Sequence, residues 1–310
     1  MSLMKWTTSD IPNLSGRRAI VTGSTSGLGL VTAAELAIHG AEVTLAVRDT
    51  ARGEHVATAI RARSAGAKVD VQRLDVADLG AVREFAAGWL GAHSRLDLLI
   101  NNAGVMAIPR ALTADGFEMQ FGTNHLGHFA LTGLLLPAIT ATPGARVVSV
   151  SSGAHRIGRM RFDDLMGAQK YSAWGAYGQS KLANLLFMSE LERRFERAGI
   201  AAFSVAAHPG YASTNLQSTS ATLNGGGFRH KFYGLGDRVM AQTAEMGALP
   251  TLYAATNASV AGGSYIGPSG IGEMRGHPKE VGMSSAARNR DNATQLWLAS
   301  EELTGVRYLD

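Results

Sequence analysis

Short runs of apolar residues alternate along this chain with longer stretches of helical periodicity. The segments that the pattern predicts as strands lie at 18–21, 41–47, 67–74, 96–100, 146–150, 200–207 and 263–267. The helical patterns lie at about 30–39, 51–64, 79–89, 117–139, 173–197, 242–257 and 286–303. A nearly continuous apolar strand such as 96–100 is typical of a parallel sheet with helices on both faces. The pattern predicts an α/β protein, a doubly wound parallel sheet in three α/β/α layers, formed by a single domain over 1–310.

Composition agrees with one large domain and excludes several kinds of site. Of the 310 residues 45% are hydrophobic and 17% charged, and cysteine is absent, which rules out disulfides, thiolate metal sites and a cysteine nucleophile. The net charge of +4 is dispersed, and its densest group, Arg156, Arg159 and Arg161, is better explained as a solvated loop than as a nucleic-acid site. The chain has no apolar run of membrane-spanning length, and the apolar core of a signal peptide is missing at its start. We therefore expect no membrane span and a cytoplasmic location.

A glycine-rich turn joins the first predicted strand to the first helix. Residues 22–29 read Thr-Gly-Ser-Thr-Ser-Gly-Leu-Gly. A helix that begins there directs free backbone N–H groups at the turn, and glycines let a pyrophosphate approach the backbone closely. The spacing Gly-x-x-x-Gly-x-Gly differs from Gly-x-Gly-x-x-Gly, and it lacks the Lys-Ser/Thr of a P-loop. The turn predicts dinucleotide binding, and a glycine-rich connection without a ligand is the alternative.

The ends of the next two strands bear on the choice of dinucleotide. The second strand ends in Val47 and Arg48, and a guanidinium there can neutralise a 2′-phosphate. This favours NADP(H) over NAD(H), although the adjacent Asp49 could instead turn toward a ribose hydroxyl. Asp75, after the third strand, could accept a hydrogen bond from adenine or cap the following helix, for which Asp78 is the better candidate.

Three side chains near the middle of the chain support proton transfer to a carbonyl. Tyr177 and Lys181 are four residues apart and share one face of a predicted helix. An ammonium one turn away is expected to lower the phenol pKa, so Tyr177 can act as acid or base. Ser152, after a buried strand, can hydrogen-bond the same substrate oxygen. His125 and His128 have no carboxylate near them in sequence, and we expect no metal site.

The order of these motifs resembles the short-chain dehydrogenase/reductase family from about residue 14 to residue 267. The resemblance implies a Rossmann-like fold and a catalytic tetrad of Asn124, Ser152, Tyr177 and Lys181. In that scheme Tyr177 is the acid/base, Ser152 orients substrate, Lys181 also binds the nicotinamide ribose, and Asn124 holds a water of a proton relay. The implied cofactor contacts are Thr22, Gly23, Ser26, Gly27, Leu28, Gly29, Arg48, Asp75, Val76, Asn102, Ala103, Gly104, Tyr177, Lys181, Pro209, Gly210 and Thr214.

One spacing narrows the resemblance to a branch of the family. Ser152 and Tyr177 are 25 residues apart, where about a dozen is usual, and the surrounding residues look like the retinol dehydrogenase and protochlorophyllide reductase branch. That branch implies NADP and lipophilic carbonyls or alcohols, here in a soluble, bacterial-type enzyme. The resemblance also implies pairing of copies through the helix with Tyr177, as a homodimer or homotetramer. Two other functions stay open, a non-catalytic NADP-binding regulator and an NADPH-dependent double-bond reductase.

Two segments are expected to complete the domain around the substrate. Residues 211–240 are rich in Gly, Ser and Thr and are interpreted as a lid over the site. The apolar side chains of this lid would favour a lipophilic small-molecule substrate; they are Tyr211, Leu216, Leu223, Phe228, Phe232, Tyr233 and Leu235. Residues 268–310 form a carboxyl-terminal extension.

Overall fold

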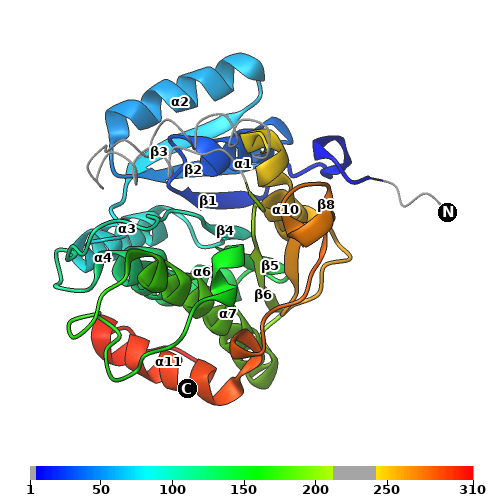
Figure 1. The fold of residues 1–310 in the computed structure, drawn as a ribbon. Helices are drawn as coiled ribbons and strands as arrows, with labels where there is room; N and C mark the ends of the chain where they lie inside the picture. The colour runs from blue at the N-terminus through cyan, green and yellow to red at the C-terminus, as the bar shows by residue number, and fades with distance from the viewer. Residues whose placement is uncertain (1–4, 212–241, 310) are drawn as a thin grey trace, which may run out of the picture.

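The protein is built around one sheet of eight strands, in the order β3-β2-β1-β4-β5-β6-β7-β8 (Figure 1). The computed structural model describes residues 5–211 and 242–309. All strand pairs from β3 to β7 are parallel, and β8 pairs antiparallel to β7. The strands are β1 (Arg18–Thr22), β2 (Glu42–Val47), β3 (Lys68–Arg73), β4 (Leu98–Asn101), β5 (Ala145–Val150), β6 (Ala202–Ala207), β7 (Tyr265–Pro268) and β8 (Pro278–Glu280). This is the predicted Rossmann-like architecture.

Helices cover both faces of the sheet, as the continuous apolar strands require. The first face is covered by α1 (Gly27–Ile38), α2 (Thr50–Arg63) and α10 (Ala244–Thr256). The second face is covered by α3 (Leu79–Ala92), α5 (Gly127–Leu134) and α7 (Ala173–Ala198), with α11 (Arg290–Thr304) packed on α7. The shorter helices α4 (Met119–Phe121) and α6 (Leu136–Thr140) flank α5.

Each strand divides its apolar residues between two cores. In β1, Ala19 and Val21 pack with α1 and α10, whereas Ile20 packs with α3 and α5. Side chains alternate between the faces of a strand, so a strand covered on both sides is apolar at most positions. This explains why the central strands were recognisable as nearly continuous apolar runs, whereas the edge strand β3 alternates apolar and polar residues.

The predicted helix over 117–139 is not one regular helix. It consists of α4, a π-helical turn (Gly122–Leu126), α5 and α6. The backbone N–H of Gly127 donates to the carbonyl of Gly122, five residues earlier, which widens the helix around Asn124. A second difference is β8, which lies within the carboxyl-terminal extension and has no strand-like pattern in the sequence.

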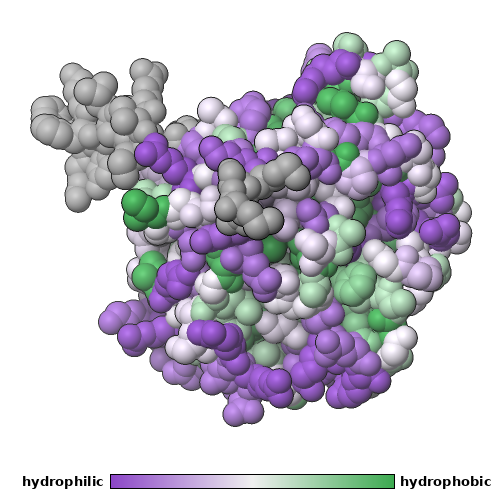
Figure 2. Space-filling view, turned by 90° about the vertical axis from the view of Figure 1, so that its right-hand side faces the viewer, coloured by the Kyte–Doolittle hydropathy of each residue, from purple (hydrophilic) through white to green (hydrophobic). Residues whose placement is uncertain are grey.

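Polar side chains cover most of the face shown in Figure 2, with smaller apolar areas between them. The large apolar side chains that are exposed among the described residues are Leu112, Ile157, Trp174, Ile271 and Leu298. Within that same part of the chain no helix is both long and apolar enough to cross a membrane. The expected lid falls almost wholly within 212–241 and so lies outside the described residues.

Candidate active site

A pocket of about 420 Å³ opens at the carboxyl ends of the central strands. Strand order reverses between β1 and β4, and open α/β sheets hold ligands at such a switch point. The predicted site residues that line the pocket are Thr22, Gly23, Ser26, Gly27, Leu28, Gly29, Arg48, Asp75, Val76, Asn102, Ala103, Gly104, Tyr177, Lys181 and Pro209. The remaining lining residues are Thr25, Ala46, Val47, Asp49, Arg52, Leu74, Val105, Thr123, Val150 and Ser151.

The glycine-rich turn is shaped by positions that only glycine fits well. Gly23 and Gly27 have φ angles of +65° and +56°, a region that other residues rarely adopt. A Cβ on Gly23 would lie 2.9 Å from the Cα of Ala103, and one on Gly29 would overlap the Asn102 side chain. The turn after β1 is therefore pressed against the turn after β4.

The amino terminus of α1 faces this pocket. Its N-cap residue, Ser26, has extended backbone angles and makes no side-chain capping bond. The first N–H groups of a helix have no partner within the helix, so an anionic ligand can satisfy them here. The donors, the absent side chains and the pocket together fit a pyrophosphate.

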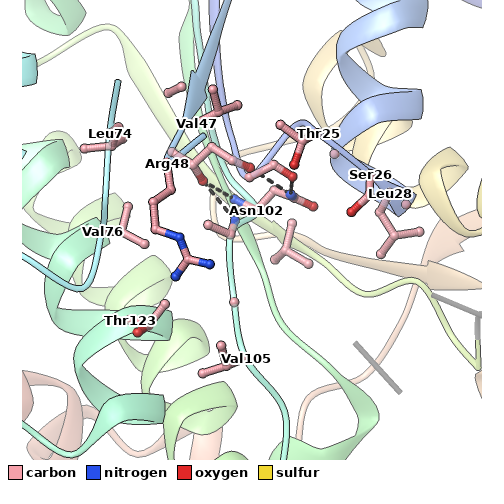
Figure 3. A pocket seen from close by; sticks show the side chains of 18 of the residues that line it. Thr25, Ser26, Leu28, Val47, Arg48, Leu74, Val76, Asn102, Val105 and Thr123 are labelled. Carbon is pink, nitrogen blue, oxygen red and sulfur yellow. Dashed lines mark hydrogen bonds between the residues drawn. The ribbon is translucent and has the colours of Figure 1, made fainter. Parts of the chain in front are cut away.

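Arg48 extends its guanidinium into the pocket on the side of Val76 and Thr123 (Figure 3). Its neighbour Asp49 is the N-cap of α2, and the Asp49 carboxylate accepts a hydrogen bond from the backbone N–H of Arg52 at 3.0 Å. Turning that carboxylate toward a ribose would cost the cap, which is typically worth ~1 kcal/mol. Arg52 also lines the pocket, which adds a second guanidinium on this side.

The Thr22 hydroxyl joins the two turns. It accepts hydrogen bonds from the backbone N–H groups of Asn102 and Ala103, both at 2.9 Å. The Asn102 side chain in turn donates to the carbonyl of Thr22 at 2.8 Å and to that of Gly23 at 3.3 Å (Figure 3). Asn102 is thus held mainly by the backbone of the glycine turn, and Ala103 and Gly104 follow it along the pocket wall.

Tyr177 and Ser152 meet at the end of β5. The Ser152 hydroxyl lies close enough to the Tyr177 phenol to lower its pKa, and the Ser152 oxygen accepts a hydrogen bond from the N–H of Ala154 at 3.2 Å. Tyr177 is buried, and burial raises the pKa of its phenol, while the neighbouring Ser152 hydroxyl acts in the opposite direction. Burial is the largest effect, so the net shift of the phenol pKa is upward and not the downward shift expected from the sequence. Tyr177 is therefore a protonated phenol at neutral pH in this state.

The Lys181 side chain lies below the tyrosine ring. Its Nζ donates to the carbonyl of Val150 at 3.0 Å and lies 5.8 Å from the centre of the Tyr177 ring. Burial lowers the pKa of Lys181 to about 8. The ammonium is still the main form at pH 7, and it is placed where its charge can act on a developing phenolate.

Asn124 lies in the π-helical turn, and both the oxygen and the nitrogen of its side-chain amide form hydrogen bonds. Its side chain accepts from the N–H of Val105 at 2.8 Å and donates to the Val105 carbonyl at 2.9 Å and to Ser180 at 2.8 Å. A Cβ on Gly104 would lie 2.9 Å from the Asn124 amide oxygen and 3.6 Å from Lys181 Nζ. Gly104 after β4, Asn124 in the π-helical turn and Lys181 on α7 therefore lie close together, although they come from three separate sequence motifs.

The carboxyl-terminal extension reaches the residues that follow β6. The N–H of Gly210 donates to His208 Nδ1 at 3.2 Å, and His208 Nε2 lies 3.2 Å from the carboxylate of Glu273. Arg156 donates to the same carboxylate at 3.1 Å. The extension therefore fixes Pro209 and Gly210 beside the pocket.

Most of the predicted site residues are brought together. Asn124, Ser152 and Gly210 do not line the pocket themselves but contact residues that do, or lie next to them in the chain. Thr214 lies outside the described residues. Sequence reasoning missed Arg52, Val105 and Thr123. Arg52 had a usable signal, because it stands four residues after Arg48, whereas Thr123 is placed only by the π-helical turn.

The family model described as short chain dehydrogenase matches residues 17–224. Mouse retinol dehydrogenase 12 is 40% identical over 297 residues, which cover 95% of this chain and 88% of the relative. Human retinol dehydrogenase 11 is 39% identical, with 94% and 87% covered.

Solved structures give the same picture. An uncharacterised protein from Mycobacterium paratuberculosis is 46% identical with a TM-score of 0.81, and 98% of this chain and 99% of that one are covered. An NAD(P)-dependent gluconate 5-dehydrogenase from Beutenbergia cavernae, solved with bound NADP, is 26% identical with a TM-score of 0.63, covering 82% and 95%.

Proposed function

The chain belongs to the short-chain dehydrogenase/reductase family, in its retinol dehydrogenase-like branch, and we propose that it is an NADP-dependent enzyme that interconverts carbonyls and alcohols on lipophilic small molecules. Its membership makes it an oxidoreductase. The observation that carries the finer proposal is that Tyr177 and Lys181 share one pocket with the glycine turn and Arg48.

NADP suits the residues around the adenosine end of the pocket better than NAD. The guanidiniums of Arg48 and Arg52 both border it, while the carboxylate of Asp49 is engaged in capping α2. A 2′-phosphate can form charge-assisted hydrogen bonds with guanidinium groups. Asp75 lines the same end, and its Oδ1 accepts from the N–H of Ala77 at 3.0 Å, which holds the carboxylate in place for adenine. The protein named above as binding NADP shares this fold.

At the other end of the pocket the residues are arranged for proton transfer. A bound NADPH would supply the hydride. Tyr177, kept protonated by burial, donates its proton to the substrate oxygen, and Ser152 donates a hydrogen bond to the same oxygen as charge develops. The Lys181 ammonium stabilises the phenolate that results. In the direction of alcohol oxidation the same groups act in reverse.

A lipophilic substrate is supported by an exposed aromatic side chain next to the catalytic tyrosine. The Trp174 side chain is 54% exposed, and its ring centre lies 6.0 Å from that of Tyr177 in an edge-to-face arrangement. Large exposed apolar groups beside a pocket are characteristic of ligand-binding surfaces. The relatives named retinol dehydrogenases suggest the class of substrate, and the proposed lid would cover it.

The proposal is tested by a screen of lipophilic aldehydes, ketones and alcohols with NADPH, NADP, NADH and NAD, using wild type and Tyr177→Phe. We expect turnover with the NADP pair, and a loss of ~10²–10⁴-fold in kcat in the variant with unchanged NADPH affinity. A regulator would bind NADPH and turn nothing over. Equal activity of wild type and variant would remove Tyr177 as the acid/base.

A further inference from the structure

A buried histidine links the glycine turn to the catalytic asparagine. His128 lies on α5 with 3% of its surface exposed. Its Nε2 is 2.9 Å from the Thr22 hydroxyl oxygen, and its Nδ1 is 3.1 Å from the backbone carbonyl of Asn124. Thr22 and His128 are 106 positions apart in the chain. The ring therefore spans the distance between the pyrophosphate turn and the π-helical turn.

The surrounding bonds decide which ring nitrogen carries the proton. A carbonyl oxygen only accepts, so the bond to Asn124 requires a proton on Nδ1. The Thr22 oxygen already accepts from the N–H groups of Asn102 and Ala103, which use both of its lone pairs. The hydrogen of the Thr22 hydroxyl has two acceptors within reach, His128 Nε2 at 2.9 Å and the Ile100 carbonyl at 3.3 Å. The shorter contact is to Nε2, which carries no proton and needs a donor, so Thr22 donates to His128. Burial and the nearby charge of Lys181 lower the pKa of His128 to about 4, so the ring is neutral at pH 7.

These hydrogen bonds form a series in which every donor is directed toward Asn124. They run from the backbone of Asn102 and Ala103 to Thr22, from Thr22 to His128, and from His128 to the Asn124 carbonyl. Bonds in series polarise one another. Since Thr22, Asn102 and Ala103 line the pocket, a ligand seated against them acts on one end of the chain, and the other end is the carbonyl of Asn124.

We propose that His128 is a positioning residue that couples the seating of the dinucleotide at Thr22 to the placement of the Asn124 carbonyl for proton transfer. This rests on the proposed function, in which Asn124 belongs to the catalytic tetrad. His125, one turn away and equally buried, bonds instead to Ser300 at 2.8 Å, on α11 and outside the pocket lining. It provides a matched control.

The tautomer can be measured on the ligand-free protein. Long-range proton–nitrogen NMR spectra of the ¹⁵N-labelled full chain, with the His128 signals assigned from His128→Gln, should show a neutral ring protonated at Nδ1 from pH 5.5 to 8. A ring protonated at Nε2, or one that titrates in this range, would overturn the proposal. This result does not depend on finding a substrate.

Two substitutions, each of which preserves the position of one ring nitrogen, test the contacts of His128 with Asn124 and with Thr22 separately. The amide nitrogen of His128→Asn replaces the Nδ1 donor, and the amide of His128→Gln reaches the Nε2 position. We expect kcat to fall ~10-fold in the Gln variant and less than ~3-fold in the Asn variant, because a net hydrogen bond is worth about one such factor. We expect the NADPH dissociation constant to rise ~3- to 10-fold in the Asn variant alone.

Measuring kcat, NADPH affinity and melting temperature for His125→Asn gives the effect of losing a buried histidine that does not contact Thr22 or the Asn124 carbonyl. That variant should melt at a lower temperature while its kcat and NADPH affinity stay at the wild-type values. If both His128 variants change kcat and NADPH affinity by equal factors, or behave as His125→Asn does, His128 is only a core residue. If wild type binds NADPH but turns over no substrate, the proposed function fails, while the tautomer and the affinities still decide whether His128 links the two turns.

Discussion

The Lys181 ammonium lies 5.8 Å from the centre of the Tyr177 ring and donates to the Val150 carbonyl rather than to the phenol. The lysine therefore acts on the tyrosine through charge, and only while it is protonated. With a pKa of about 8 it is an ammonium below that pH and a neutral amine above it. The pKa of Tyr177 is raised, so the phenol keeps its proton over the same range.

The first prediction is that kcat/KM for NADPH in carbonyl reduction is constant at low pH and declines above about pH 8. This parameter reports groups in the free enzyme. In Lys181→Arg the cation persists to pH above 12, so the decline should disappear even if the rate is lower. A decline at the same pH in both proteins would assign it to another group.

The second prediction concerns the choice of cofactor. Arg48→Asp should reduce the preference for NADPH over NADH by ~10- to 100-fold, because it removes one guanidinium from the 2′-phosphate and adds a carboxylate that repels it. The measurement is the ratio of kcat/KM for the two cofactors. Arg290→Asp, an exposed change of equal charge on α11 and away from the pocket lining, should leave that ratio unaltered.

The third prediction tests the close packing behind the pocket. Gly104→Ala places a methyl group 2.9 Å from the Asn124 amide and close to Lys181, so kcat should fall by at least ~10-fold in a protein that remains folded. Gly91→Ala on α3 meets no atom within 4 Å. It should retain full activity and gain stability by ~0.5–1 kcal/mol, measured by urea unfolding.

The fourth prediction addresses the substrate. Trp174→Ala should raise KM for long-chain aldehydes by ~10-fold while KM for a short, water-soluble aldehyde changes less than ~2-fold, since only a large apolar substrate can bury itself against the indole. Leu298→Ala, which truncates an exposed apolar side chain on α11, is the control. Equal effects on both aldehydes would remove Trp174 from the substrate surface.

The sheet was predictable because buried parallel strands are apolar at most positions. The run at 146–150 corresponds to β5 at Ala145–Val150, and the order of motifs assigned the glycine turn, Tyr177 and Lys181 to one edge of the sheet. The strand β8 was missed because its three residues, Pro-Lys-Glu, are short, polar and only partly buried. Local pattern carries little information for such a strand.

Electrostatic detail was less accessible from sequence. The spacing of Tyr177 and Lys181 correctly predicts proximity, but not that burial outweighs the charge and raises the phenol pKa. His128 is a second example, because the sequence places it on a helix and indicates nothing about its hydrogen-bond partners. Its contact with Thr22 could not be foreseen, because no periodicity relates residues so far apart.

The antiparallel strand β8 has a consequence for the solubility of shortened proteins. The sheet has two edge strands, β3 and β8. The strand β3 bears Lys68, Asp70 and Arg73, charges that oppose edge-to-edge pairing with a strand of another molecule. The inner strand β7 has no such protection and is shielded by β8. A chain that stops after residue 270 would leave β7 free to recruit strands from other copies. Light scattering should detect a particle size that grows with concentration for the shortened chain, whereas the full chain should keep one size over the same range.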